Sequence, residues 1–194
     1  MNMMEELENH ALKILVVGDS GVGKTNIVGR FLHNTYNPHA NSTTHAQQHI
    51  HTLNIGRRKV TAQVWDTPGG EEHMGTMSGL YEGAVGAMLV YDVTSAQSFQ
   101  NITEWLEDMK EERDDYIVPM LVGNKCDLDN QRAFPVFDAE FFAIRNDMLF
   151  MEISALEGTD VDFAFKTLLN HCCRYSSSHS TSTKSFTSSS FTSS

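Results

Sequence analysis

A glycine-rich segment near the amino end has the residue types and spacing needed to hold phosphate. It reads Gly18-Asp19-Ser20-Gly21-Val22-Gly23-Lys24-Thr25, which fits G-x-x-x-x-G-K-[ST], and it lies between an expected strand and an expected helix. Its glycines let backbone N–H groups point inward, and the start of the helix adds a favourable partial charge. A glycine-rich βα turn without a ligand is the alternative. The flanking strand and helix favour a phosphate cradle.

Two side chains of this segment could act directly on a bound nucleotide. Lys24 would reach the β- and γ-phosphates. The hydroxyl of Thr25 would be one ligand of Mg²⁺, a hard cation that prefers oxygen. We therefore expect a nucleotide and Mg²⁺ at this end of the site.

A second motif indicates which base is bound. Asn124-Lys125-Cys126-Asp127 follows an apolar run that ends at Val122-Gly123, so it falls at the carboxyl edge of the predicted sheet, where open α/β folds bind ligands. Asp127 could accept two hydrogen bonds from guanine, at N1–H and at the exocyclic amine. Adenine offers no such donor pair and would leave the carboxylate unpaired. The motif therefore favours guanine and argues against an ATPase or kinase.

Together with Trp65-Asp66-Thr67-Pro68-Gly69 and Ser154-Ala155-Leu156, these motifs resemble the nucleotide-binding motifs of Ras-like GTPases. Gly83-Ala84-Val85-Gly86-Ala87 and the Trp before Asp66 are similar to the Rab branch in particular. The resemblance covers about residues 12–175. It implies the P-loop small GTPase fold and a switch that binds GTP and hydrolyses it to GDP in vesicle and membrane traffic.

Carried over by position, the resemblance assigns roles around the base. It implies that Asn124 ties the base loop to the phosphate loop, that the stem of Lys125 packs on guanine, and that Ala155 donates its N–H to the guanine carbonyl. Tyr36 falls where the family places an aromatic ring near the base, although simple packing is its alternative role. The expected nucleotide-binding residues are Ser20, Gly21, Val22, Gly23, Lys24, Thr25, Asn26, Tyr36, Thr43, Asp66, Gly69, Asn124, Lys125, Asp127, Ser154, Ala155 and Leu156.

The resemblance also implies two loops that sense the γ-phosphate. Thr43 would complete Mg²⁺ coordination, and its spacing from Trp65 favours it over Thr44. Gly69 would donate its N–H to the phosphate, and Asp66 would hold Mg²⁺ through water. Losing the γ-phosphate would release both loops, which is the switch signal. The expected catalytic positions are Lys24, Thr43, Gly69 and Gly70.

One of these positions departs from the family pattern. Where the family has Asp-Thr-Ala-Gly-Gln-Glu, this chain has Asp66-Thr67-Pro68-Gly69-Gly70-Glu71, so the glutamine that orients water is Gly70. Because phosphoryl transfer depends on positioning and electrostatics, its loss should slow hydrolysis and leave binding intact. We expect intrinsic turnover to be at least roughly tenfold slower, about 1.4 kcal/mol of barrier. The alternative is a binding scaffold that stays loaded with GTP or does not hydrolyse it.

Alternating strand and helix patterns must position these motifs, and they predict an α/β fold with a six-stranded, mostly parallel sheet and about five helices. A hairpin at Asn54-Ile55-Gly56-Arg57 should make the sheet mixed, and the alternating run at Val60 to Trp65 suggests a sheet edge. The expected strands begin near Leu12, Ile50, Val60, Ala84, Ile117 and Met148. The expected helices are Lys24 to His33, about Ser95 to Arg113, about Val136 to Arg145, and Asp160 to Tyr175.

The predicted domains are an extension at residues 1–11, a nucleotide-binding domain at 12–175 and a disordered Ser/Thr-rich tail at 176–194. Three cysteines in a chain of 194 residues argue against a disulfide framework and for a cytoplasmic compartment. A formal charge of −11 argues against nucleic acid as a partner. Rab proteins usually carry prenylated cysteines at the C-terminus, but Cys172 and Cys173 fall inside the last expected helix, so no direct lipid anchor is evident.

Partners follow from the resemblance. We expect a monomer that meets exchange factors, GTPase-activating proteins and effectors through residues 37–50 and 66–82, peripheral on endomembranes through those partners. In place of the family's apolar patch the chain has Trp65 with Gln48 and Leu80, which indicates an unusual set of effectors. Histidines crowd the first of these segments, but no carboxylate or thiolate lies nearby in sequence to support a zinc site.

Overall fold

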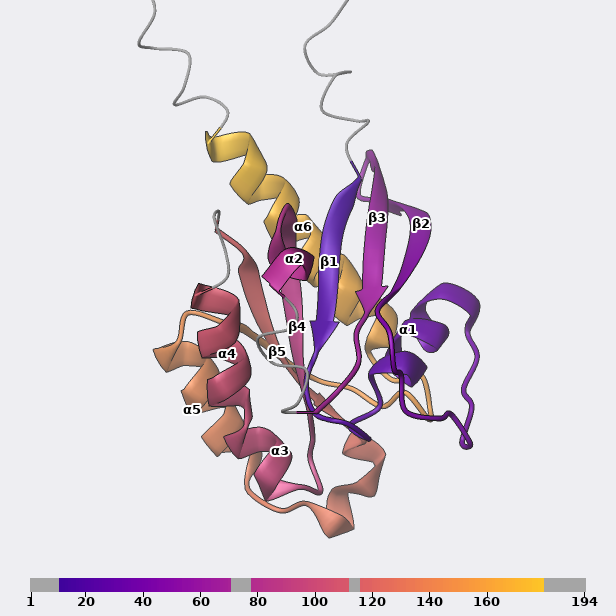
Figure 1. Ribbon diagram of the computed structural model, residues 1–194, viewed down its shortest axis with the longest axis vertical. Helices are drawn as coiled ribbons and strands as arrows, with labels where there is room; N and C mark the ends of the chain where they lie inside the picture. Colours follow the sequence, from indigo (N-terminus) through magenta and orange to yellow (C-terminus); the bar gives the residue numbers. More distant parts are fainter. Residues whose placement is uncertain (1–10, 71–77, 112–115, 180–194) are drawn as a thin grey trace, which may run out of the picture.

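Six β-strands form one sheet at the centre of the structure (Figure 1). The computed structural model describes residues 11–70, 78–111 and 116–179. The strands are β1 (Leu12–Val17), β2 (Gln47–Ile55), β3 (Arg58–Asp66), β4 (Ala84–Asp92), β5 (Val118–Asn124) and β6 (Leu149–Glu152). The helices are α1 (Lys24–His33), α2 (Ser78–Tyr81), α3 (Ala96–Gln100), α4 (Ile102–Glu111), α5 (Val136–Arg145) and α6 (Val161–His179), with a 3-10 helix, η3 (Cys126–Gln131).

The strand order is β2-β3-β1-β4-β5-β6, and only the β2–β3 pair is antiparallel. These two strands meet in the hairpin that the sequence predicted; in it Ile55 pairs with Arg58, and Gly56 has a φ of 61°. The α/β fold with a mixed, mostly parallel sheet is therefore confirmed. Parallel strands end at the same edge of a sheet, so the loops after β1, β3, β5 and β6 share one end of the molecule.

Two apolar cores lie on opposite faces of the sheet (Figure 1). On one face α1 and α6 pack against the sheet, and α6 contributes the stripe of Val161, Phe165, Leu168 and Cys172 that the sequence predicted, each at most 1% exposed. On the other face α4 contributes Trp105 and α5 contributes two small alanines. The layered cores hold the sheet rigid beneath the loops that follow its strands.

The helix bounds were predicted well where the chain has clear end signals. Helices α1 and α5 begin and end where the pattern placed them. The single helix expected at Ser95 to Arg113 is instead divided into α3 and α4 at Asn101, whose side-chain amide donates to Asp19 at 2.8 Å from across the fold. The short elements α2 and η3 were not predicted, because one or two turns leave no periodic pattern.

Two further details differ from expectation. Strand β3 is not at the sheet edge, because β2 covers it. Its alternation has another cause: Val60, Ala62 and Val64 face the core, and the side chains between them are only partly covered. Helix α6 continues to His179, four residues past its predicted end, and residues 180–194 of the predicted tail lie outside the described part, as do residues 1–10 of the extension.

The three cysteines lie in the part of the chain that the structure describes. All three cysteines are free. Cys172 is buried against β4, where burial raises the pKa of its thiol to about 12. Among the described residues, no helix combines the length and apolarity needed to cross a bilayer. The described residues also contain no group of three or more histidine, cysteine, aspartate or glutamate side chains placed to hold a metal ion.

Two phenylalanines of α6 allow a matched test of this packing. Phe165 is fully buried and stacks on Phe31 with ring centroids 4.0 Å apart, whereas Phe163 is 61% exposed. We expect Phe165→Ala to lower the free energy of unfolding by about 3–5 kcal/mol through cavity formation. Phe163→Ala should change it by about 0.5 kcal/mol or less. Urea unfolding followed by circular dichroism, with equal GDP in every sample, measures both, and similar losses in the two variants would contradict this packing.

Candidate functional site

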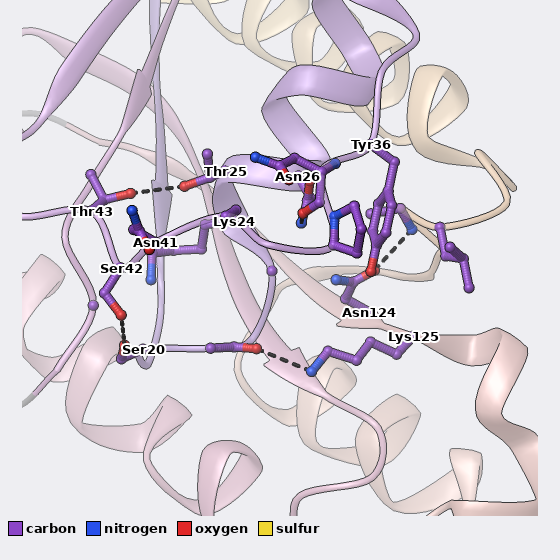
Figure 2. A pocket seen from close by; sticks show the side chains of 18 of the residues that line it. Ser20, Lys24, Thr25, Asn26, Tyr36, Asn41, Ser42, Thr43, Asn124 and Lys125 are labelled. Atoms are coloured by element: carbon purple, nitrogen blue, oxygen red, sulfur yellow. Dashed lines mark hydrogen bonds between the residues drawn. The ribbon is translucent and has the colours of Figure 1, made fainter.

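The loops at the carboxyl edge of the sheet enclose a cavity of about 310 Å³. Figure 2 shows Ser20, Lys24 and Thr25 at one end of it, with Asn124, Lys125 and Tyr36 at the other. The lining residues are Ser20, Gly21, Gly23, Lys24, Thr25, Asn26, Tyr36, Asn37, Pro38, Ala40, Asn41, Ser42, Thr43, Gly69, Asn124, Lys125, Asp127, Leu128, Ala155 and Leu156. The two motifs found in the sequence therefore meet in one pocket.

The phosphate-loop end offers free backbone donors. Helix α1 begins at Lys24 after Gly23, and no side chain caps the helix N-terminus. Gly23 has a φ of 101°, and an added Cβ would lie 2.4 Å from Nδ2 of Asn124, so only glycine fits at this position. The first N–H groups of a helix lack intrahelical partners and attract anions. This end of the pocket suits phosphate.

Lys24 is a buried cation in the floor of this loop. It is 6% exposed, and its Nζ donates to the carbonyl oxygens of Gly18 at 2.7 Å and Asp19 at 2.8 Å. Burial lowers the pKa of Lys24 to about 8, against the opposing effect of the charges on Asp66 and Asp19. Gly69 packs closely here, since an added Cβ would lie 2.4 Å from this Nζ. An anion bound in the cradle would stabilise the charged form of Lys24.

Three oxygen-bearing side chains from separate segments converge beside the cradle. The hydroxyl of Thr25 lies 2.8 Å from that of Thr43 (Figure 2). It donates to Oδ2 of Asp66 at 2.7 Å. Thr43 lines the pocket, whereas Thr44 is not among the lining residues. Oδ1 of Asp66 is buried and has no hydrogen-bond partner among the described residues, and burial raises the pKa of this carboxyl. Such an oxygen set with one unsatisfied acceptor fits Mg²⁺, held directly or through water.

The base end is built from two loops joined by side chains. Asn124 donates through Nδ2 to the carbonyl of Val22 at 2.8 Å and accepts from the N–H of Ala155 at 3.1 Å. Oδ1 of Asp127 accepts from the hydroxyl of Ser154 at 2.5 Å, and Asp127 itself lines the pocket. In this structure the Ala155 N–H thus has a protein acceptor, so donation to a guanine carbonyl would need that bond to be shared or exchanged.

Lys125 is held in place from two sides. Its backbone is left-handed, with a φ of 66°, and its Nζ donates to the carbonyl of Gly21 at 3.0 Å and to Oδ2 of Asp92 at 2.5 Å. These bonds lay the aliphatic stem along the pocket between the base and phosphate ends. The ion pair with Asp92 was not predicted, because nothing in the local sequence connects the end of β4 with the loop after β5.

Some predicted residues lie behind the pocket wall or beside it. Asp66, Ser154 and Val22 are not lining residues; they act on the pocket through the contacts given above. Gly70 also lies outside the lining and has a φ of 122°, a conformation that side chains rarely adopt. The lining includes residues that sequence reasoning missed, among them Asn37, Ser42 and Leu128.

The loop after α1 is closed over the pocket by polar contacts that carried no sequence signal. Asn26 and Asn37 exchange two hydrogen bonds, at 3.0 and 2.8 Å, and the hydroxyls of Ser20 and Ser42 lie 3.2 Å apart. Tyr36 lines the pocket beside them and is 37% exposed. Ser, Asn and Thr side chains are common in any loop, so only the fold shows which of them meet.

Comparison with known proteins assigns this arrangement to a family. The family model described as "Ras family" matches residues 13–174, which include every residue lining the pocket. The Ras-related protein RABA4d of Arabidopsis thaliana is 45% identical over 166 residues, covering 86% of this chain and 75% of the relative. The Ras-related protein Rab11A of Lotus japonicus is 45% identical over 161 residues, covering 83% and 71% respectively.

The depressed pKa of Lys24 gives a testable pH dependence. Below about pH 8 the side chain is charged in the free protein, and a bound phosphate would hold its pKa higher still. Affinity for GDP should therefore be level below pH 8 and fall by up to about tenfold per pH unit above it, because binding then requires proton uptake. Equilibrium binding of fluorescent GDP between pH 6.5 and 9.5 measures this.

The control for this titration is Lys24→Met, which should bind GDP weakly and without a break near pH 8. A wild-type protein whose affinity stays constant up to pH 9.5 would contradict the predicted role of Lys24.

Proposed function

This chain belongs to the Ras family of small GTPases and has relatives of the Rab11 and RabA type, and from that premise we propose that it is a GTP-dependent molecular switch. It binds GTP and GDP in the pocket described above and hydrolyses GTP to GDP. One observation carries the proposal: the buried cation Lys24 and the carboxylate of Asp127 line the same cavity. Lys24 lies at one end of it, and Asn124 and Lys125 of the motif that contains Asp127 lie at the other (Figure 2). A triphosphate and a guanine base need those two groups.

Different residues of the pocket bind different parts of the nucleotide. The N-terminus of α1 and Lys24 hold the phosphates, and Asp127 identifies the base. Thr25, Thr43 and Asp66 would hold Mg²⁺, which neutralises charge on the β- and γ-phosphates. Because Thr43 and Gly69 belong to different segments, contact of both with a γ-phosphate would order residues 37–50 and 66–70 together. Its loss would release them, which is the switch signal.

Hydrolysis should be slow without a partner. The position that orients the attacking water in the family is Gly70, which has no side chain to do so, and its backbone at φ 122° suits glycine. Pro68 further restricts the segment and removes one N–H. A second candidate function rests on the same observation: a binding scaffold that remains loaded with GTP. An activating protein that supplies its own water-orienting group would separate a working switch from this scaffold.

We place the switch in vesicle and membrane traffic, the role that the resemblance to Rab proteins implies. Residues 37–50 and 66–82 would meet exchange factors, activating proteins and effectors, although residues 71–77 lie outside the described part. Gln48 pairs with Trp65 across β2 and β3, and Leu80 packs on the core nearby. A polar glutamine beside the partly buried Trp65 supports an effector set unlike that of typical Rab proteins.

The choice of base is tested with two aspartates. Asp127→Ala removes two charge-assisted hydrogen bonds, so affinity for GDP should fall about a hundredfold or more. Asp138→Ala, which changes an exposed residue of α5, should leave it unchanged. Competition of GDP and ADP for the labelled nucleotide measures both. Wild-type protein that binds ADP as well as GDP would refute the assignment.

The role of Gly70 is tested by single-turnover hydrolysis of bound GTP. Gly70→Gln restores a group that can orient water, so it should hydrolyse GTP about tenfold faster than the wild type, equivalent to about 1.4 kcal/mol. Gly70→Ala is subject to the same backbone restriction but lacks the side-chain amide, so its rate of GTP hydrolysis should not exceed that of the wild type. If the wild type already matches Gly70→Gln, slow intrinsic hydrolysis is wrong.

A further inference from the structure

A partly buried ion pair lies next to the base-recognition loops and outside the pocket lining. The guanidinium of Arg132 donates from Nη1 to Oε1 of Glu152 at 2.6 Å and from Nη2 to Oε2 at 2.9 Å. Both side chains are about 15% exposed, at 14% and 15% respectively. Two parallel bonds between planar groups fix orientation as well as distance. The pair is therefore a rigid link between the segments that carry it.

Those segments are the two loops that recognise the base. Arg132 directly follows η3, the turn that carries Asp127, and its own N–H donates back to the carbonyl of Asp129 at 3.3 Å. Glu152 is the last residue of β6 and stands two residues before Ser154. The pair thus joins the exit of the first loop to the entrance of the second.

The position of Asp127 depends on these loops keeping their relative placement. Oδ1 of Asp127 accepts from the Ser154 hydroxyl, which itself accepts from the N–H of Glu157 at 3.0 Å. The N–H of Cys126 donates to the carbonyl of Ile153 at 3.1 Å. Two of these three bonds, Ser154 to Asp127 and Cys126 to Ile153, cross between the loops, so a shift of one loop relative to the other would move the Asp127 carboxylate.

The ion pair is also partly shielded from water. Tyr91 lies against it with its hydroxyl buried, and burial and the charge on Glu152 raise the pKa of this phenol. An added Cβ at Gly123 would lie 2.5 Å from the Tyr91 oxygen and 3.2 Å from Cγ of Glu152, so the space is filled. Water and salt screen a partly buried pair less than an exposed one. Losing Glu152 removes the bidentate partner of Arg132 and leaves it only the exposed carboxylate of Asp129, whose Oδ1 accepts from Nε at 3.1 Å.

We propose that Arg132 and Glu152 form a positioning pair that holds Asp127 in register with Ser154 and thereby sets the selectivity for guanine. The inference rests on the proposed function, because it concerns the same pocket. The pair acts on the base end alone: Lys24, Thr25 and Asp66 belong to other loops and make no contact with it in the interactions described above.

Two conservative variants test the pair in the full-length chain. Glu152→Gln keeps the shape and removes the charge, and Arg132→Lys keeps the charge and removes the fork. Lys166→Met is the matched control, because it breaks the exposed 2.6 Å pair between Lys166 and Asp162 on α6. The measurements are the dissociation rate of fluorescent GDP and the affinities for GDP and for inosine diphosphate, which lacks the exocyclic amine.

The expected change in GDP binding corresponds to the loss of one hydrogen bond between guanine and the Asp127 carboxylate. Both pair variants should release GDP about tenfold faster, and their preference for GDP over inosine diphosphate should fall by a similar factor. Lys166→Met should match the wild type in both respects. Circular dichroism of each GDP-bound variant establishes that it is folded.

Two results would overturn the proposal. One is wild-type dissociation of GDP from both folded pair variants. The other is equal weakening of GDP and inosine diphosphate, which is the mark of general loosening and not of a displaced Asp127. The wild-type protein distinguishes failure of this proposal from failure of the proposed function. If the wild type does not prefer GDP over ADP, the proposed function is wrong. If it does prefer GDP and the pair variants behave like the wild type, only the positioning role of Arg132 and Glu152 is wrong.

Discussion

One buried amide, the side chain of Asn124, is the contact on which the pocket depends. Its two polar atoms bind the loops after β1 and β6, while its backbone ends β5, so a single residue joins three loops. Asn124 is 2% exposed, and a buried amide without partners is costly, which gives the junction a strong preference for one geometry. Phosphate and base can be held at a fixed separation because this junction fixes the loops that hold them.

The same principle governs the rest of the site: polar groups converge from separate strands and satisfy one another across the fold. The carboxylate of Asp19 in the phosphate loop accepts from the side chains of Asn101 and Trp105 at 2.8 Å each, which connects this loop to α4. Lys125 joins the phosphate loop to the end of β4. The phosphate loop is thus supported by α4 and by the end of β4, and the groups with incomplete partners, Lys24 and Asp66, are those that a phosphate and a cation would satisfy.

The sequence predicted most of the fold and the centre of the site, because both have local signatures. Glycines at fixed spacing mark the cradle, and apolar runs mark the strands and the bounds of α1 and α5. The alternation in β3 was misinterpreted, since a strand covered on one face alternates wherever it stands in the sheet. The division at Asn101 and the contacts of Arg132, Asp92 and Asn37 join residues distant in sequence or common in loops. Without the fold, nothing distinguishes them from solvated side chains.

The burial of Lys24 in the nucleotide pocket makes the chain's tolerance of mutations depend on the concentration of nucleotide in its surroundings. A ligand present at a thousandfold excess over its dissociation constant adds about 4 kcal/mol to the stability of the native state. That margin can absorb a typical point substitution, which costs about 1 kcal/mol. Substitutions in the helices and the sheet are therefore tolerated as long as nucleotide fills the pocket. Substitutions in the three joined loops weaken nucleotide binding and so also remove the stability that the bound nucleotide adds.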